Sequence, residues 1–274
     1  MFIPKRIGQQ GKIYMSECLK VNKNGQILEI VIDRPKANAI DAATSREMGR
    51  IFAEFRDDPD LRVAILTGAG DKFFSAGWDL KAVSDGEEYF GDFGEGGFGG
   101  FTEMPDLLKP VICAINGMAV GAGFEMILRA DFILAAEYAL FLMPEVRIGI
   151  APDVGIFMLS KLLPRQKALE ILMTGRRYSA HELASFGLIN EVVPADQLME
   201  RARAFAQELL QAAPLSLAAV KEAVYRTETL TFEESCAALR SKTWPAFMKM
   251  LESSDAQEGA RAFVEKRKPE WKGG

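Results

Sequence analysis

Residues 111–125, VICAINGMAVGAGFE, combine a strand, a tight turn and a helix start in one stretch, which limits the folds open to the chain. An apolar run at 111–115 stops at an Asn-Gly pair, and a second apolar piece leads into Gly-Ala-Gly at 121–123. A helix-like run with one acidic residue, Glu125, follows. Small residues let a ligand approach the backbone closely. The first N–H groups of a helix have no partner within it, so they suit a developing negative charge on oxygen.

The same residues also fit a purely structural turn, in which Glu125 only faces the positive end of the helix dipole. A second stretch, residues 68–82, GAGDKFFSAGWDLKA, has the same design, because small residues at 75–77 precede another helix-like piece. Two such turns can each offer one backbone N–H to a shared oxygen. The GAG at 68–70 is not a dinucleotide-binding fingerprint, since no third glycine follows three residues later.

Glu145 is a second acidic candidate. It follows a proline in an apolar neighbourhood, where burying a carboxylate without a purpose is costly. Desolvation raises the pKa of a carboxyl, which suits a proton donor near neutral pH. Asp153 precedes a helix-like run at 154–163, so we expect its side chain to cap that helix.

The hydrophobic patterns predict an α/β chain. Short, nearly all-apolar strands of the kind that parallel sheets bury alternate with helices, and helices fill the C-terminal part. The predicted strands are residues 25–33, 62–67, 111–115, 130–135 and 188–193. Helices are predicted from Asp41 to the break at 57–60, and at 154–163, 168–173, 179–186, 197–212, 215–225, 232–250 and 256–267.

Residues 91–100 contain six glycines and two phenylalanines, so no regular element is expected there. One interpretation is a mobile active-site loop whose aromatic rings close on a ligand. The other is a surface insertion without a function.

Composition argues against several function classes. The chain has 274 residues and a net charge of −5, which disfavours a nucleic-acid surface. No apolar run reaches the roughly 18 residues of a membrane span. Its three widely spaced cysteines fit neither a disulfide framework nor a metal site, so we expect a reducing cytoplasm. Residues 1–15 lack the features of a signal peptide and are expected to form a loose extension.

The single histidine, His181, lies between Ser179 and Glu182, whose spacing is that of a capping box at a helix start. We therefore expect a surface residue in a first helical turn. Without a second histidine, Ser-His-Asp catalysis, Cys-His catalysis and histidine-rich zinc sites lose their usual parts. Acid–base chemistry would fall to aspartate and glutamate.

The chain resembles the enoyl-CoA hydratase/isomerase superfamily, also called the crotonase family. The segments that carry the resemblance are Arg-Pro-Lys-Ala at 34–37, residues 67–79, residues 109–125 and the Pro-Glu pair at 144–145. The resemblance extends from about residue 25 to residue 272. It implies a crotonase-like ββα spiral core at residues 16–200. A C-terminal helical region at 201–274 would then form trimers or dimers of trimers.

The resemblance also implies a site. The backbone N–H groups of Trp78 and Ala122 would form an oxyanion hole, although the family usually has glycine at the second position. Glu125 would activate water for attack at Cβ of an acyl-CoA thioester, and Glu145 would deliver a proton to Cα. No metal or cofactor would be needed, because CoA is part of the substrate. The implied substrate-binding and CoA-binding residues are Lys36, Ala37, Ala76, Gly77, Asp79, Leu80, Gly121 and Asp153, with Phe263 and Lys266 from a neighbouring subunit.

Residues 32–45, 56–82 and 265–273 resemble the branch of the superfamily that interconverts crotonobetainyl-CoA and L-carnitinyl-CoA. Trp78, Phe98 or Phe101 would then hold the quaternary ammonium group by cation–π contact, with Asp153 complementing its charge. Two enzyme alternatives remain open: a general short-chain enoyl-CoA hydratase, and an enoyl- or dienoyl-CoA isomerase. Dienoyl-CoA isomerases resemble the segment from Glu145 to Asp153 but usually carry aspartate where this chain has Glu125. A third alternative is an assembly or binding protein that keeps the fold without turnover.

Overall fold

A computed structural model describes residues 14, 15 and 17–274. The predicted loose extension at 1–15 lies mostly outside the described residues. Its last two residues differ from the prediction, because Tyr14–Met15 form strand β1, which pairs antiparallel with β2 (Leu19–Asn24). The sheet therefore begins before residue 16.

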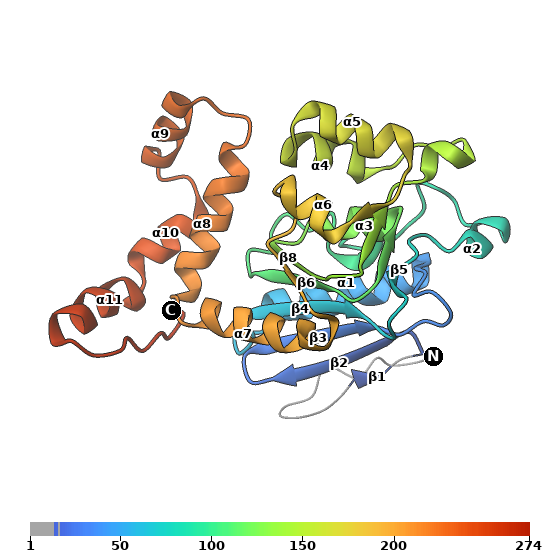
Figure 1. The fold of residues 1–274 in the computed structure, drawn as a ribbon. Helices are drawn as coiled ribbons and strands as arrows, with labels where there is room; N and C mark the ends of the chain where they lie inside the picture. The colour runs from blue at the N-terminus through green and yellow to red at the C-terminus, as the bar shows by residue number, and fades with distance from the viewer. Residues whose placement is uncertain (1–13, 16) are drawn as a thin grey trace. The chain divides into compact units, whose positions relative to one another are not determined.

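The larger sheet has seven strands in the order β1-β2-β3-β4-β6-β8-β11 (Figure 1). From β3 onward all neighbours are parallel. Every residue of β4 and β6 is buried, as expected for parallel strands covered on both faces. The bounds are β3 Ile27–Ile32, β4 Val63–Gly68, β6 Val111–Ile115, β8 Phe132–Ala136 and β11 Glu191–Val193.

A second sheet of short strands has the order β10-β9-β7-β5. Its strands are β5 Phe73–Ser75, β7 Met118–Val120, β9 Leu140–Leu142 and β10 Tyr178–Ser179. Three successive ββα units each place one strand in the large sheet and one in the small sheet before a helix follows. These helices are α2 (Leu80–Ser84), α3 (Ala122–Ile127) and α4 (Val154–Leu162) (Figure 1). The predicted ββα spiral is confirmed.

Helix α1 (Ala42–Asp57) has the predicted start and buried face. The Asp41 carboxylate accepts a hydrogen bond of 2.8 Å from Thr44 N–H, which supplies a partner to the first helical turn. Met48, Phe52 and Phe55 are buried in the core at helical spacing.

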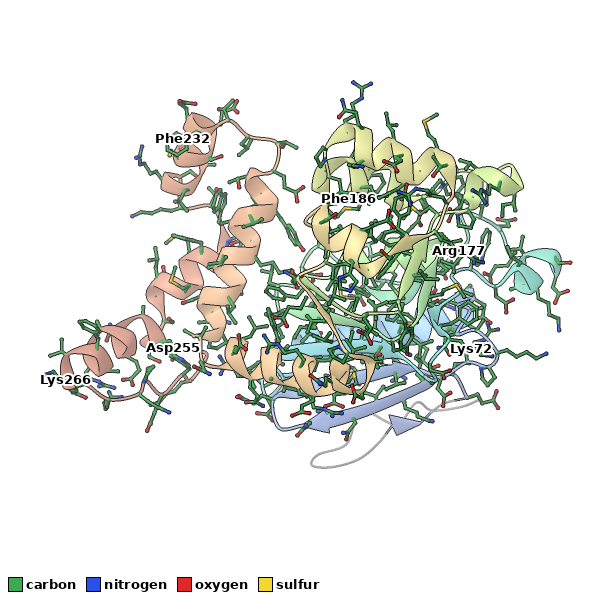
Figure 2. All side chains as sticks on the ribbon, viewed as in Figure 1. Lys72, Arg177, Phe186, Phe232, Asp255 and Lys266 are labelled. Atoms are coloured by element: carbon green, nitrogen blue, oxygen red, sulfur yellow. The ribbon has the colours of Figure 1, made fainter. Side chains whose placement is uncertain are left out.

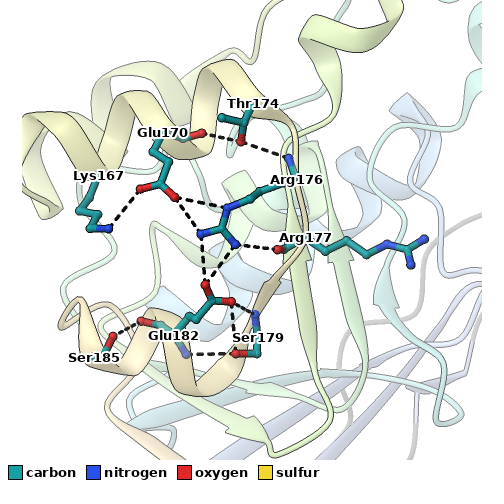
Figure 3. Close-up of polar contacts among 8 residues, drawn as sticks. All are labelled: Lys167, Glu170, Thr174, Arg176, Arg177, Ser179, Glu182 and Ser185. Carbon is teal, nitrogen blue, oxygen red and sulfur yellow. Dashed lines mark hydrogen bonds and ion pairs between the residues drawn. The ribbon is translucent and has the colours of Figure 1, made fainter.

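The capping box before α6 (Ala180–Ser185) is also confirmed (Figure 3). Glu182 N–H donates to the Ser179 hydroxyl at 3.2 Å, and Ser179 N–H donates to the Glu182 carboxylate at 3.1 Å. Arg176 joins that carboxylate to Glu170 of α5 (Arg165–Thr174). His181 is exposed in the first turn of α6, as predicted.

The chain divides into two compact units, residues up to 107 with 111–206, and residues 108–110 with 207–274. The predicted boundary at 200 falls inside helix α7 (Leu198–Leu210). The second unit contains α8 Pro214–Thr227, α9 Phe232–Arg240, α10 Pro245–Glu252 and α11 Ser254–Glu265. Within the described residues, no helix combines the length and the apolar character that a bilayer crossing requires.

The predicted single helix at 232–250 is wrong, because α9 ends at Arg240 and α10 begins at Pro245. Proline has no N–H and fixes φ, so it is tolerated at the start of a helix but not in its middle.

In the second unit, the Asp255 carboxylate (labelled in Figure 2) holds the C-terminal segment. It accepts hydrogen bonds from Lys272 and Gly273 N–H at 2.8 and 2.9 Å.

An ion pair between a buried carboxylate and a partly exposed arginine joins helix α7 to the large sheet in the first unit. Glu29 of β3 is 7% exposed, and the Arg203 guanidinium donates to both of its oxygens at 2.8 and 2.9 Å. These hydrogen bonds hold the pKa of Glu29 below its ordinary value. A surface pair of the same type, Arg201 with Glu191, has the same two-bond geometry but about 30% exposed side chains.

We expect Arg203→Met to lower the free energy of unfolding by about 2–3 kcal/mol at pH 7, since it leaves a buried carboxylate without its partner. The folded-state pKa of Glu29 lies below its unfolded value. Its contribution is therefore present above the unfolded pKa and is lost as the pH falls through the folded value. Urea unfolding of wild type and variant should thus converge below about pH 4. The matched control, Arg201→Met, should cost about 1 kcal/mol or less. Equal costs for the two variants would contradict the assignment.

Candidate active site

Two strand-to-helix turns, β5 to α2 and β7 to α3, touch each other through their backbones. A Cβ atom added at Gly77 would lie 2.5 Å from Val120 O and 2.9 Å from Ala122 N. A Cβ atom added at Gly123 would lie 2.6 Å from Ser75 O. Side chains at these two positions would separate the turns, so glycine is required for the contact. The contact brings residues 78 and 122 together, as the two similar sequence stretches suggest.

Among the described residues, the peptide N–H groups of Trp78 and Ala122, one at each turn, have no protein acceptor. Gly77 O accepts from Ile40 N–H and Asp79 N–H donates to Ile40 O, at 2.8 and 2.9 Å, so the Trp78 N–H between them points to the opposite side. Ala122 is the first residue of α3, where no carbonyl within the helix can be reached. Within residues 17–274, neither N–H donates to another protein group.

A cavity of roughly 150 Å³ opens at this contact. The turn residues Ala76, Trp78, Gly121 and Ala122 line it, together with Leu80. Three carboxyl groups also line it, those of Glu125, Glu145 and Asp153, and none of the described lysines and arginines does so. The arrangement therefore combines unpaired donors with acidic groups in one small space.

Glu125 lies in the first turn of α3 and is 5% exposed. Its Oε1 accepts a hydrogen bond of 3.2 Å from Gly155 N–H, near the start of α4. Burial raises the pKa of Glu125 to about 7, and the negative charge of Glu145 adds to the rise. The carboxyl is thus able to take or give a proton near neutral pH.

Glu145 lies on a short 3₁₀ helix, Glu145–Ile148, directly after Pro144, and is 8% exposed. Burial raises its pKa as well. Its Oε2 is buried without a hydrogen-bond partner among the described residues. A Cβ atom added at Gly121 would lie 2.6 Å from Glu145 Oε1, so this carboxyl lies directly against the Ala122 turn. A buried unpaired carboxyl oxygen points to a ligand as its partner.

Aromatic rings form one side of the cavity. The Trp78 ring meets Tyr89 and Phe93 edge-on at centroid distances of 5.7 and 6.4 Å, and Phe93 meets Phe98 at 5.6 Å. All four rings line the cavity. We call these four residues the aromatic wall.

The loop prediction is partly corrected. Phe98 lies in the wall, but Phe101 is only 2% exposed and packs on Phe52 at 4.6 Å, so its predicted ligand contact is wrong. Phe101 faces the core because α1 offers it an apolar partner. Phe93 was included only as one of the two phenylalanines of residues 91–100, and Tyr89 was not singled out from the sequence. Their only sequence indication is that large aromatic residues stand in a polar, glycine-rich segment.

Asp153 corrects another expectation. It stands at the N-cap position of α4, but its side chain makes no capping hydrogen bond. It lines the cavity instead. The side chain therefore lines the cavity and does not cap the helix, and its predicted substrate contact stays a prediction.

Several predicted residues lie away from the cavity lining. The Asp79 carboxylate pairs with Arg34 at 2.7 Å and accepts from Lys81 N–H at the start of α2. Lys36 and Ala37 do not line the cavity either. In the second unit, Phe263 is 86% exposed on α11 and Lys266 follows that helix (Figure 2). The CoA contacts of these residues stay predictions.

The sequence profile described as enoyl-CoA hydratase/isomerase matches residues 22–274 of the chain. The chain belongs to the enoyl-CoA hydratase/isomerase family. Carnitinyl-CoA dehydratase of Salmonella typhi is 55% identical over 260 residues, which cover 94% of this chain and all of that protein. The same enzyme of Salmonella arizonae is 54% identical over the same coverage.

Solved structures agree with this family. An enoyl-CoA hydratase from Mycobacterium tuberculosis superimposes with a TM-score of 0.86 at 35% identity, covering 94% of this chain and all of that one. An enoyl-CoA hydratase from Bacillus anthracis gives a TM-score of 0.83 at 31% identity, covering 93% and 99%. The predicted family, the fold and an enzyme of the enoyl-CoA hydratase type are thereby confirmed.

We expect Glu125→Gln to stabilise this family member at alkaline pH. The folded-state pKa of Glu125 lies above its unfolded value, so the stability linked to its protonation is fully present below the unfolded pKa and is lost as the pH rises through about 7. Glutamine removes this loss and still accepts from Gly155. Urea unfolding should show a gain of about 1–3 kcal/mol at pH 8 and almost none at pH 4. The exposed control, Glu252→Gln, should show no gain at either pH. A pH-independent gain would refute the raised pKa.

Proposed function

We propose that the protein catalyses the reversible addition of water to the double bond of a 2-enoyl-CoA thioester, with crotonobetainyl-CoA and L-carnitinyl-CoA as its substrate pair. The observation that carries the proposal is the single cavity in which Glu125 and Glu145 lie beside the outward N–H groups of Trp78 and Ala122. An enolate-forming reaction requires both kinds of group: carboxyls that transfer protons and N–H groups that bind the negative oxygen.

In the proposed mechanism the two N–H groups bind the thioester oxygen. Hydration moves electrons from the double bond onto that oxygen, so an enolate forms and its negative charge strengthens both hydrogen bonds. Donors that are fixed before the reaction stabilise this charge more than the neutral substrate, which lowers the barrier. Alanine serves at position 122 because its backbone N–H, and not its side chain, is the donor.

One proton shared between Glu125 and Glu145 is enough for both directions. In hydration, ionised Glu125 takes a proton from water as the hydroxyl adds to Cβ, and protonated Glu145 gives its proton to Cα. The proton is then on Glu125, which is the form that dehydration needs, since Glu125 returns it to the leaving hydroxyl while Glu145 removes the Cα proton. Two neighbouring buried carboxyls favour this singly protonated state because a second negative charge is costly. The proposed chemistry uses no metal or redox cofactor.

Replacing either carboxyl should stop turnover without unfolding the protein. We expect Glu125→Gln and Glu145→Gln each to lower kcat about 10²–10⁴-fold, since each removes a positioned proton-transfer group. The measurement is the loss of enoyl-thioester absorbance on hydration. The control variant Glu252→Gln, which changes an exposed carboxyl on α10, should keep the wild-type rate. A near-wild-type kcat in either active-site variant would remove that residue from the mechanism.

The acyl group is proposed from the charge and shape of the cavity. A carnitine-type chain carries a quaternary ammonium group, which aromatic faces and carboxylates attract. The cavity offers an aromatic wall and three carboxyl groups, and no cation of the described residues lines it. The name of the 55% identical relatives, carnitinyl-CoA dehydratase, agrees with such a substrate.

We expect the Asp153 carboxylate to help bind the positive charge of the quaternary ammonium group. We expect Asp153→Asn to raise KM for crotonobetainyl-CoA by about tenfold, because the cavity loses a negative charge near the ammonium group, and to leave KM for neutral crotonyl-CoA nearly unchanged. Steady-state kinetics with both thioesters test this. An unchanged KM for crotonobetainyl-CoA would dismiss the role of Asp153.

The main alternative is a hydratase of short uncharged acyl chains, and a strong wild-type preference for crotonyl-CoA in kcat/KM would favour it. A binding protein of the same fold would show no turnover of either thioester.

We also propose a cytoplasmic location and a trimer or dimer of trimers. The exposed apolar side chains of Phe263 and Val264 on α11, 86% and 79% exposed, support an assembly through the second unit.

A further inference from the structure

We infer that Glu87 is a positioning residue that fixes Trp78, and with it the aromatic wall, to the start of helix α1. The inference rests on the proposed function, because it concerns the choice of acyl group in the same cavity. Glu87 does not itself line the cavity. It acts through the tryptophan that does.

The Glu87 carboxylate makes two hydrogen bonds to groups that are far apart in the sequence. Oε1 accepts from Trp78 Nε1 at 2.5 Å, and Oε2 accepts from Ala42 N–H at 2.9 Å. Ala42 is the first residue of the 16-residue helix α1, whose N-terminal end carries partial positive charge and favours an anion. Charge-assisted hydrogen bonds of this kind are stronger than neutral ones. The carboxylate therefore ties the indole to a rigid helix end.

A second ion-pair network fastens the neighbouring residue to the same helix end. The Arg34 guanidinium contacts Asp41, the N-cap of α1, at 2.8 Å and Asp79 at 2.7 Å. Trp78 is thus held on both sides: its side chain by Glu87 and its following residue by Arg34. The Arg34 network fixes the turn that carries the Trp78 N–H. This leaves the orientation of the indole ring as the specific task of Glu87.

The orientation of the indole matters for the whole wall, because Trp78 is the ring that Tyr89 and Phe93 both meet edge-on. A rotated indole would remove the flat face that a quaternary ammonium group needs, whereas a small uncharged acyl chain makes no such demand. The expected consequence is a loss of selectivity with the oxyanion donors left in place.

Glu87→Gln tests this, with Glu88→Gln as the matched control. Glutamine has nearly the same size, but it replaces one of the two accepting oxygens by an NH₂ donor, which would face the N–H of Trp78 or of Ala42. The Glu88 side chain is exposed and takes part in no hydrogen bond or ion pair with another described residue. We expect Glu87→Gln to lower kcat/KM for crotonobetainyl-CoA about tenfold relative to that for crotonyl-CoA, the size expected for a lost charge-assisted bond. Glu88→Gln should leave the ratio unchanged.

A second readout does not depend on activity. The protein has three tryptophans, so ¹H–¹⁵N spectra of the indole groups contain three resonances, and Trp78→Phe identifies that of Trp78. Glu87→Gln should shift this resonance alone, and Glu88→Gln should shift none. An unmoved Trp78 resonance, or an equal loss for both thioesters, would overturn the inference. If wild-type protein hydrates neither thioester, the proposed function fails, and the indole resonance alone still decides whether Glu87 holds Trp78.

Discussion

The backbone contact between the two strand-to-helix turns is the constraint on which the site depends. Gly77 and Gly123 leave no room for a side chain, because the opposing backbone atoms lie within 3 Å of where a Cβ would be. The spiral fold creates this contact, since β5 and β7 are parallel neighbours in the small sheet and each leads into a turn at the same edge. The N–H groups of Trp78 and Ala122, which belong to successive ββα units, are thereby brought to one cavity.

The electrostatics of the cavity follow from that geometry. Helix α3 begins at the contact, so Glu125 in its first turn is buried beside the N–H groups, and the next repeat brings Glu145 against the same turn. Burying two carboxyls is unfavourable, and the rise in both pKa values expresses this cost. In the proposed mechanism this cost keeps one proton available at neutral pH. Activity and stability would then be opposed at Glu125.

The sequence predicted the parts of the fold that are encoded locally. The apolar runs of β3, β4, β6 and β8 identify buried parallel strands without knowledge of their partners. Strands of two or three residues, such as β5, β7 and β10, carry too little pattern to be predicted, and they are defined by their pairing within the small sheet. The break before Pro245 was readable from the proline rule, and apolar spacing across it misled the prediction.

The residues of the site likewise fall into those that the sequence predicts and those that it does not. Glu125, Glu145 and the two small-residue turns were predictable, because each combines an unusual residue with a local pattern. The place of Phe101 was not, since it depends on the apolar partner that α1 offers, and the missing capping bond of Asp153 at the start of α4 was not predictable either.

The start of α1 shows how a site depends on groups that never touch a ligand. Three acidic side chains converge there: Asp41 caps the helix, Asp79 reaches it through Arg34, and Glu87 accepts from its first N–H. The positive end of the helix dipole offsets the repulsion among these carboxylates. In this cluster, Asp79 and Arg34 hold the turn that carries the Trp78 N–H, and Glu87 holds the Trp78 ring. Under the proposed function, rate and substrate choice would therefore be adjusted separately, by changing the turn or the ring, although both belong to one residue.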